Sequence, residues 1–170
     1  MGLLDRALTT TSTAVVVGAS KGIGLALTAA ILQRGSGRVV AASRRPAESE
    51  ALRSLAIEFP GRVTPIACDT TDAPSLQAMS AQIRQEHNQG IDLLLNVAGV
   101  LHETETGIMP ERSLASIDPE RMARVLATNA MGPVLTTQAL QKQLNKGALI
   151  GNLSARVGSI GDNGLGGWWS

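Results

Sequence analysis

Short apolar runs rich in β-branched residues alternate with longer helix-forming segments along this chain, and this alternation restricts the fold more than any other feature. The runs are apolar at consecutive positions, which is typical of strands buried on both faces of a parallel sheet. Alternation of such strands with helices predicts right-handed βαβ units. We therefore expect an α/β fold, a doubly wound parallel sheet with helices on both faces. The strands are predicted at Ala14–Val17, Val39–Ala42, Val63–Ala67, Ile91–Leu95 and Ala148–Ile150.

The expected helices are bounded by capping and breaking residues. A first helix is predicted at Gly22–Arg34, and a second at Pro46–Phe59, because proline suits the first turn of a helix. Asp72 is placed to cap a third helix. A long fourth helix is expected from Pro119 to about Leu144, with a kink where Gly132 is followed by proline.

Composition excludes several classes of protein. The 170 residues carry 15 Lys and Arg against 14 Asp and Glu, so a nucleic-acid or membrane-surface binder, which needs a basic face, is not expected. The single cysteine, Cys68, rules out an internal disulfide, and no metal site is expected. No apolar run is long enough to span a membrane, so we expect a cytoplasmic protein, with an organelle left open. The length suits one domain over residues 1–170, in which the glycine-rich segment 154–170 is predicted to be a loop.

A glycine-rich segment, residues 18–24, joins the first predicted strand to the first predicted helix. Gly18 permits a tight turn, while Gly22 and Gly24 allow backbone to approach a ligand and the helix to pack close to the strand. The free N–H groups and positive dipole end of a helix N-terminus favour an anion. A tight turn without a ligand has the same glycines. The position at the first strand–helix junction favours the alternative that this loop binds a nucleotide.

The loop Gly18-Ala-Ser-Lys-Gly-Ile-Gly24 resembles the cofactor loop of the short-chain dehydrogenase/reductase family, and three further motifs follow in the family's order. Asp69 is similar to the family's adenine-pocket aspartate. Residues 96–99, Asn-Val-Ala-Gly, resemble its Asn-Asn-Ala-Gly motif with one substitution, and Asn129 occupies the place of the asparagine in its catalytic tetrad. Residues 152–160 are most similar to the C-factor-like and sniffer-like carbonyl reductase branch.

Each of these residues also has an ordinary structural interpretation. Asp69 also suits a loop cap, Asn96 a turn, and Asn129 a helix position where the side chain bonds a local carbonyl. The order of all four motifs, which spans essentially the whole chain, favours the family. The resemblance implies a Rossmann-type fold whose first five strands are present. It assigns cofactor binding to Gly18, Ser20, Lys21, Gly22, Ile23, Gly24, Ser43, Arg44, Asp69, Thr70, Asn96, Ala98 and Gly99.

The end of the second predicted strand favours NADP(H) over NAD(H). A protein that binds NAD(H) places an acidic residue there to accept hydrogen bonds from the ribose. This chain instead has Ser43 and Arg44, and the next acid is Glu48. A guanidinium suits a 2′-phosphate, and Lys21 adds positive charge in the first loop. The alternative is that these cations are ordinary surface charges.

The family's chemistry depends on groups that this chain carries only in part. The resemblance implies a tyrosine that exchanges a proton with the substrate, a lysine four positions later, a serine, and the asparagine at 129. The chain contains no tyrosine, and it ends at Ser170, about where that tyrosine would follow, so we interpret it as C-terminally incomplete. Alignment on Asn152 puts Ala155 at the usual serine position. Ser154 or Ser159 is the candidate replacement, and the alternative is that both serines are ordinary loop residues.

The resemblance predicts an NADP(H)-dependent oxidoreductase that reduces a small carbonyl compound or oxidises the matching alcohol, and a homo-oligomeric parent protein. Two alternatives stay open. The first is that the chain is a non-catalytic module that binds NADP(H) or pairs with a full-length relative. The second is that it is an incomplete gene model. With the later strands of the sheet missing, the fifth strand is expected to form an exposed sheet edge. Such an edge predicts low stability and a tendency to aggregate.

Overall fold

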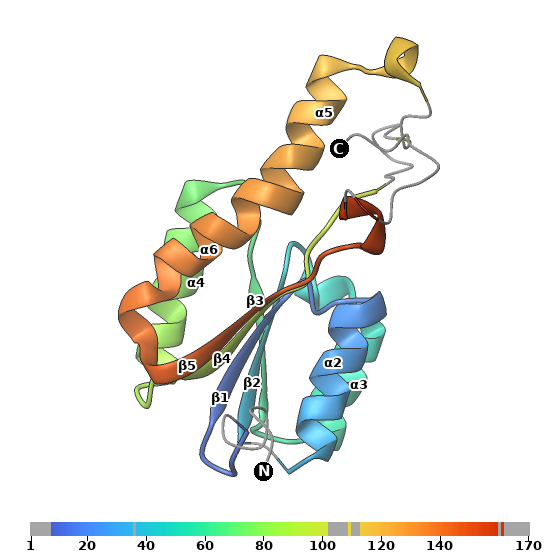
Figure 1. The fold of residues 1–170 in the computed structure, drawn as a ribbon. Coiled ribbons are helices and arrows are strands. Elements are labelled where there is room, and N and C mark those ends of the chain that lie inside the picture. Colours follow the sequence, from blue (N-terminus) through green and yellow to red (C-terminus); the bar gives the residue numbers. More distant parts are fainter. Residues whose placement is uncertain (1–7, 36, 102–108, 110–112, 160, 162–170) are drawn as a thin grey trace.

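In the computed structural model, residues 8–35, 37–101, 109, 113–159 and 161 are described. All neighbouring strands of the five-stranded sheet are parallel, in the order β3-β2-β1-β4-β5. The prediction of a Rossmann-type, doubly wound parallel sheet is confirmed (Figure 1). The strands are β1 (Thr13–Val17), β2 (Arg38–Ser43), β3 (Val63–Ala67), β4 (Ile91–Asn96) and β5 (Leu144–Asn152).

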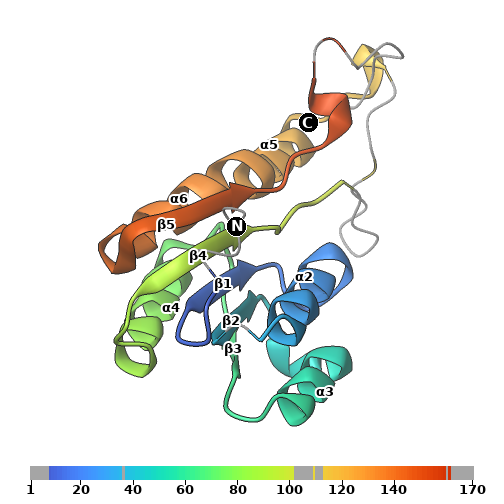
Figure 2. The ribbon, with the colours of Figure 1, turned by 60° about the horizontal axis from the view of Figure 1, so that its bottom comes forward.

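Helices cover both faces of this sheet (Figures 1 and 2). Helices α2 and α3 pack on one face, and α4 and α6 pack on the other, as the crossovers of a doubly wound sheet require. A π-helical turn at Ala127–Met131 joins α5 to α6 without a break in the helical path. The helices are α2 (Gly22–Gln33), α3 (Glu50–Glu58), α4 (Ala73–Glu86), α5 (Pro119–Leu126) and α6 (Gly132–Leu140).

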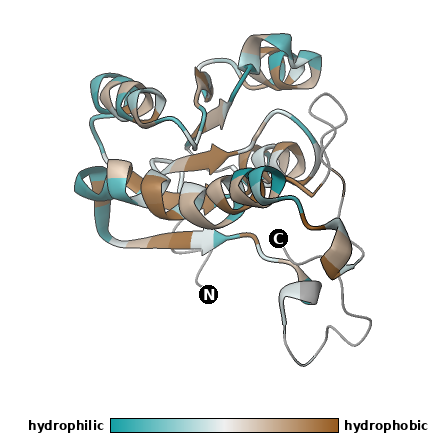
Figure 3. Cartoon of the chain, turned by 90° about the horizontal axis from the view of Figure 1, so that it is seen from above, coloured by the Kyte–Doolittle hydropathy of each residue, from teal (hydrophilic) through white to brown (hydrophobic). Residues whose placement is uncertain are grey.

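The core consists of two apolar layers, one on each face of the sheet. Successive side chains of a strand point to opposite faces, so Val15 packs with Met79 of α4 while Val16 packs with Ile31 of α2 and Leu52 of α3. All five are buried. Apolar colouring runs along the strands, and hydrophilic positions lie mainly on helices and turns (Figure 3). The two layers hold the strand ends, and hence the loops that follow them, in fixed positions.

The second predicted helix begins later than expected. Pro46–Glu48 forms a separate 3-10 turn, and α3 begins at Glu50. Ser49 separates the two because its Oγ accepts a hydrogen bond from the backbone N–H of Leu52, the usual role of a helix N-cap. The Ser49 hydroxyl also donates to the carbonyl of Ser20, at 2.7 Å. This bond ties the start of α3 to the glycine-rich loop.

The long fourth helix also differs from its prediction. Its irregular segment is the π-helical turn immediately before Gly132, and α6 ends at Leu140. Pro133 has no N–H to donate to the carbonyl four residues earlier, so the regular ladder fails in the turn that precedes it. The prediction for Leu144 was wrong, since this residue begins β5. Gly147, with φ of +86°, lies where the β4–β5 register shifts.

Strand β5 forms an edge of the sheet, as predicted. Only β4 pairs with it among the described strands, and Ile150 is 45% exposed. The low stability and aggregation expected from this edge stay predictions. In the part of the chain that the structure describes, no helix is long and apolar enough to cross a membrane.

Candidate functional site

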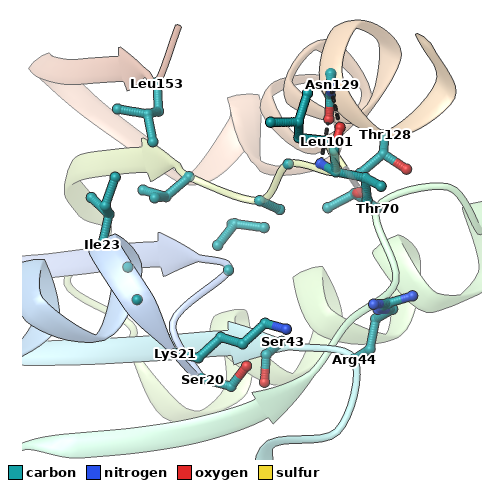
Figure 4. A pocket seen from close by; sticks show the side chains of 18 of the residues that line it. Ser20, Lys21, Ile23, Ser43, Arg44, Thr70, Leu101, Thr128, Asn129 and Leu153 are labelled. Carbon is teal, nitrogen blue, oxygen red and sulfur yellow. Dashed lines mark hydrogen bonds between the residues drawn. The ribbon is translucent and has the colours of Figure 1, made fainter. Parts of the chain in front are cut away.

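A cavity of about 780 Å³ lies at the carboxyl ends of the strands. The loops after β1, β2, β3 and β4 form its floor, and the start of α2, the end of α5 and the segment after β5 form its walls. Figure 4 shows Ser20, Lys21, Ser43 and Arg44 on one side and Thr128 and Asn129 opposite. Doubly wound sheets bind ligands at this edge, because neighbouring crossovers diverge there.

The three glycines of the first loop are needed for three different reasons. Gly18 has φ of +95°, and a Cβ there would lie 2.6 Å from the backbone nitrogen of Ala98. A Cβ at Gly24 would overlap the carbonyl oxygen of Gly18. Gly22 has φ of +55° and open space where its Cβ would be. Lys21 caps α2 without a side-chain hydrogen bond, so the N–H groups of the first turn are left for a ligand.

Ser43 and Arg44 line the cavity beside this loop. The Ser43 side chain is buried, at 6% exposure, and its hydroxyl has no hydrogen-bond partner. A buried hydroxyl without a partner is costly, so this group is suited to bond a ligand that enters the cavity. Arg44, Lys21 and Arg124 are the cations among the lining residues, and Asp69 is the one carboxylate among the lining residues that the structure describes. The cavity therefore has an excess of positive charge.

Asp69 follows β3 and holds the next loop in place. Its Oδ1 accepts hydrogen bonds from the backbone N–H and the hydroxyl of Thr71, at 2.9 and 2.7 Å. Burial acts to raise the pKa of Asp69, but these two bonds and the positive charges of Arg44 and Arg124 outweigh it and lower the pKa. The carboxylate is therefore ionised at neutral pH. Thr70, the next residue, is buried and also lines the cavity.

Cys68 precedes this aspartate and is buried. Burial, together with the negative charge of Asp69, raises the pKa of the thiol to about 11. A thiol with such a pKa carries almost no thiolate at neutral pH and is a poor nucleophile. In the described part of the chain, no three His, Cys, Asp or Glu side chains are grouped to hold a metal ion.

Asn96 does not line the cavity, although the sequence places it among the cofactor-binding residues. Its side chain is 3% exposed, and its Nδ2 donates to Oδ1 of Asn152 at 2.8 Å and to the carbonyl of Pro133 at 3.5 Å. The amide thus ties the ends of β4 and β5 to the start of α6. The following Val97, Ala98 and Gly99 do line the cavity, so this motif reaches it through its last three residues.

Asn129 lies in the π-helical turn and lines the cavity. Its amide exchanges two hydrogen bonds with the backbone of Val100, accepting from the N–H at 2.7 Å and donating to the carbonyl at 2.8 Å (Figure 4). This pairing holds the loop after β4 against the helix. A Cβ at Gly132 would lie 2.9 Å from Oγ1 of Thr70, so the same helix also approaches the loop after β3 closely.

The segment after β5 brings Leu153, Ser154, Ala155 and Gly158 to the cavity. Ser154 therefore reaches the site, whereas Ser159 is not among its lining residues. The remainder of the predicted tail, residues 160 and 162–170, lies outside the described residues.

Sequence reasoning missed Arg124 and Thr128, which also line the cavity. They lie five residues and one residue before Asn129. The spacing of four between them places both on one helix face, and this was the available signal.

Residues 12–165 match the family described as short chain dehydrogenase. The chain belongs to this family. A similar protein is 1-hydroxy-2-glutathionyl-2-methyl-3-butene dehydrogenase of Rhodococcus sp. (strain AD45), 34% identical over 159 residues that cover 94% of this chain and 63% of the relative. The chain therefore spans less than two thirds of that relative's length.

Solved structures of the family have the same fold. A carbonyl reductase from Pseudomonas aeruginosa PAO1 in complex with NADP is 29% identical, with a TM-score of 0.77 over 88% of this chain and 64% of that one. A protein from Burkholderia multivorans, described as a short-chain dehydrogenase/reductase with bound NADP, is 27% identical, with a TM-score of 0.79 over 93% and 64% of the two chains.

Proposed function

We propose that this chain binds NADP(H) in the cavity at the carboxyl edge of the sheet. The observation that carries the proposal is the hydroxyl of Ser43, which is buried without a partner beside Arg44 and Lys21. The uncapped start of α2 suits the pyrophosphate, since its N–H groups and dipole favour an anion. The bound NADP of two family members supports the same choice. The cavity residues proposed to hold the cofactor are Gly18, Ser20, Lys21, Gly22, Ile23, Gly24, Ser43, Arg44, Asp69, Thr70, Ala98 and Gly99.

The preference for NADP(H) over NAD(H) rests on the residues that follow β2. Ser43 and Arg44 offer a hydroxyl and a guanidinium for the 2′-phosphate. Glu48, the nearest acid in sequence, does not line the cavity, and its carboxylate lies 3.4 Å from Nε of Arg45. Among the described residues between β2 and α3, no acidic side chain lines the cavity, which supports NADP(H) over NAD(H).

We propose further that the parent activity is oxidoreduction of a small carbonyl compound or alcohol. When bound, the nicotinamide supplies the hydride-transfer chemistry. Exposed apolar side chains of Ile23, Leu101 and Leu153 line the cavity away from Arg44 and suit the carbon frame of such a substrate. We propose that Ser154, which lines the cavity, bonds the carbonyl oxygen and that Asn129 positions the Val100 backbone. The chain has no tyrosine, so it lacks the family's proton donor.

We propose as a second candidate function a cofactor-binding module without turnover. The two functions are separated by incubating the purified chain with NADPH and a panel of aldehydes and ketones. The binding module gives no steady NADPH oxidation, whereas measurable turnover contradicts it. An Asn129→Ala variant is the control, since a true reaction at this site slows when the Val100 loop loses both hydrogen bonds.

The cofactor proposal is tested by fluorescence titration with NADPH and NADH. Hydrogen bonds to a charged group contribute about 1.5–3 kcal/mol, so we expect NADPH to bind roughly 10- to 150-fold more tightly. Equal affinity, or tighter binding of NADH, contradicts the preference. If the chain binds neither cofactor, the binding proposal itself is wrong.

We also propose that the parent protein is a homo-oligomer. The outer side of α5, the π-helical turn and α6 exposes Leu126, Met131 and Val134. Exposed large apolar side chains on a helix surface are typical of an interface between subunits.

A further inference from the structure

Arg124 lines the same cavity as Arg44 and Asp69 but comes from a different element. Arg44 follows β2, which is the neighbour of β3 in the sheet, whereas Arg124 lies on α5, one helical turn before Thr128. Both guanidinium groups act on the carboxylate of Asp69, since both lower its pKa. The end of the cavity near Asp69 therefore has one arginine from the loop after β2 and one arginine from helix α5.

The place of Arg124 in the helix needs an explanation other than stabilisation of a helix end. A basic residue in the last turn of a helix is favoured by the macrodipole where the C-terminal carbonyls are exposed. Here Ala127 continues in helical conformation, and the π-helical turn leads directly into α6. Arg124 is therefore not at a true helix terminus, and its charge gains little from the dipole.

The geometry points to a second cofactor contact, and this inference rests on the proposed binding of NADP(H). We infer that the planar guanidinium of Arg124 stacks over the adenine ring from the helix side while Asp69 and Thr70 form the floor beneath it. None of the described residues that line the cavity is aromatic, so an arginine is the available planar partner for a base. Guanidinium groups stack on π-systems, and ammonium groups, which are compact and not planar, do so poorly.

This assignment separates the two arginines by function. Arg44 binds the 2′-phosphate and so discriminates NADP(H) from NAD(H). Arg124 contacts the adenine, which both cofactors share, and so contributes equally to both. Stacking of this kind is worth roughly 3- to 30-fold in affinity, depending on how far water is excluded.

The test uses adenosine fragments that lack the nicotinamide, so it does not depend on activity. Binding of 2′,5′-ADP and 5′-AMP is measured by calorimetry for the wild type, Arg44→Leu, Arg124→Leu and Arg124→Lys. Arg121→Leu is the matched control, because Arg121 is exposed on the same helix and does not line the cavity. Thermal unfolding verifies that each variant is folded.

We expect Arg124→Leu to weaken both fragments by the same factor, roughly 3- to 30-fold, and Arg44→Leu to weaken mainly 2′,5′-ADP. Arg124→Lys should fail to restore wild-type affinity, and Arg121→Leu should bind as the wild type does. Unchanged binding by Arg124→Leu overturns the inference. So does a loss confined to 2′,5′-ADP, which indicates a phosphate contact, or full rescue by lysine, which indicates a role of charge alone. A wild type that binds neither fragment instead refutes the proposed function.

Discussion

Replacement of His87 by leucine should stabilise this chain. His87 caps the C-terminal end of α4 and is 6% exposed, yet neither ring nitrogen has a hydrogen-bond partner. Its backbone is well anchored, since its N–H donates to the carbonyl of Ile83 at 2.8 Å. A buried polar group without a partner costs about 1–3 kcal/mol, and an apolar side chain of similar size avoids this cost. We therefore expect His87→Leu to raise the free energy of unfolding by about 1–3 kcal/mol at neutral pH.

The size of the gain should depend on pH. Burial lowers the pKa of His87, with Arg38 acting in the same direction and Glu86 opposing. The unfolded chain takes up a proton near the ordinary histidine pKa of about 6.5, while the folded chain resists it. The unfolded state then binds more protons, so the wild type loses stability as the pH falls through about 6.5. Leucine does not titrate, and the advantage of the variant should grow toward pH 5.

Urea unfolding of the wild type and His87→Leu at pH 8, 7, 6 and 5 measures both effects. A gain of this size corresponds to a rise in Tm of about 2–12 °C for a chain of this length. His87→Gln is the control, because it keeps a buried polar side chain without the titration and should remove the pH dependence with little gain at pH 8. Equal or lower stability of His87→Leu at pH 8, or an unchanged pH slope, would refute the reasoning.

Three further predictions follow from close contacts and exposed side chains. Gly24→Ala should weaken NADPH binding at least tenfold in a fluorescence titration, because its Cβ overlaps the carbonyl of Gly18; wild-type affinity would contradict this. Gly132→Ala should lower the free energy of unfolding by about 1–3 kcal/mol, because the new Cβ would lie 2.9 Å from Oγ1 of Thr70. In a double-mutant cycle, Thr70→Gly should reduce that loss. Val134→Glu should shift the sedimentation coefficient toward that of a monomer, while an unchanged assembly would exclude this helix face from the interface.

The central strands β1 and β2 were predictable because burial on both faces leaves a run of apolar residues, and such runs have few other interpretations. The starts of α3 and β5 were not. Proline and an early glutamate suit the first turn of a 3-10 helix and of an α-helix alike, so Pro46 did not distinguish the 3-10 turn from the helix that Ser49 caps. Leu144 continues the apolar spacing of the preceding helix, and only the sheet contacts of β4 decide that it begins a strand.

The residues that line the cavity were predictable where their role depends on backbone conformation. They were less predictable where the role depends on the direction of a side chain. The loop glycines are recognisable because a side chain would clash at Gly18 and Gly24 and would be strained at the positive φ of Gly18 and Gly22. Asn96 ends a buried strand and points into the interior with Leu94, as the two-residue period of a strand requires. Arg124 has the appearance of an ordinary surface charge on a helix. Arg124 reaches the cavity only because the helical segment from α5 to α6 packs closely against the loop after β3.

The loop after β4 connects the two ends of the site. Gly18 lies against Ala98 with no room for a Cβ, and two residues later the backbone of Val100 is paired with the side chain of Asn129. These loops follow β1 and β4, the central strands between which the direction of the crossovers reverses. Any side chain at position 18 must therefore displace the loop that Asn129 holds. The glycine loop and the π-helical turn that carries Asn129 therefore both contact the loop after β4, the first through its backbone at Gly18 and the second through the Asn129 side chain.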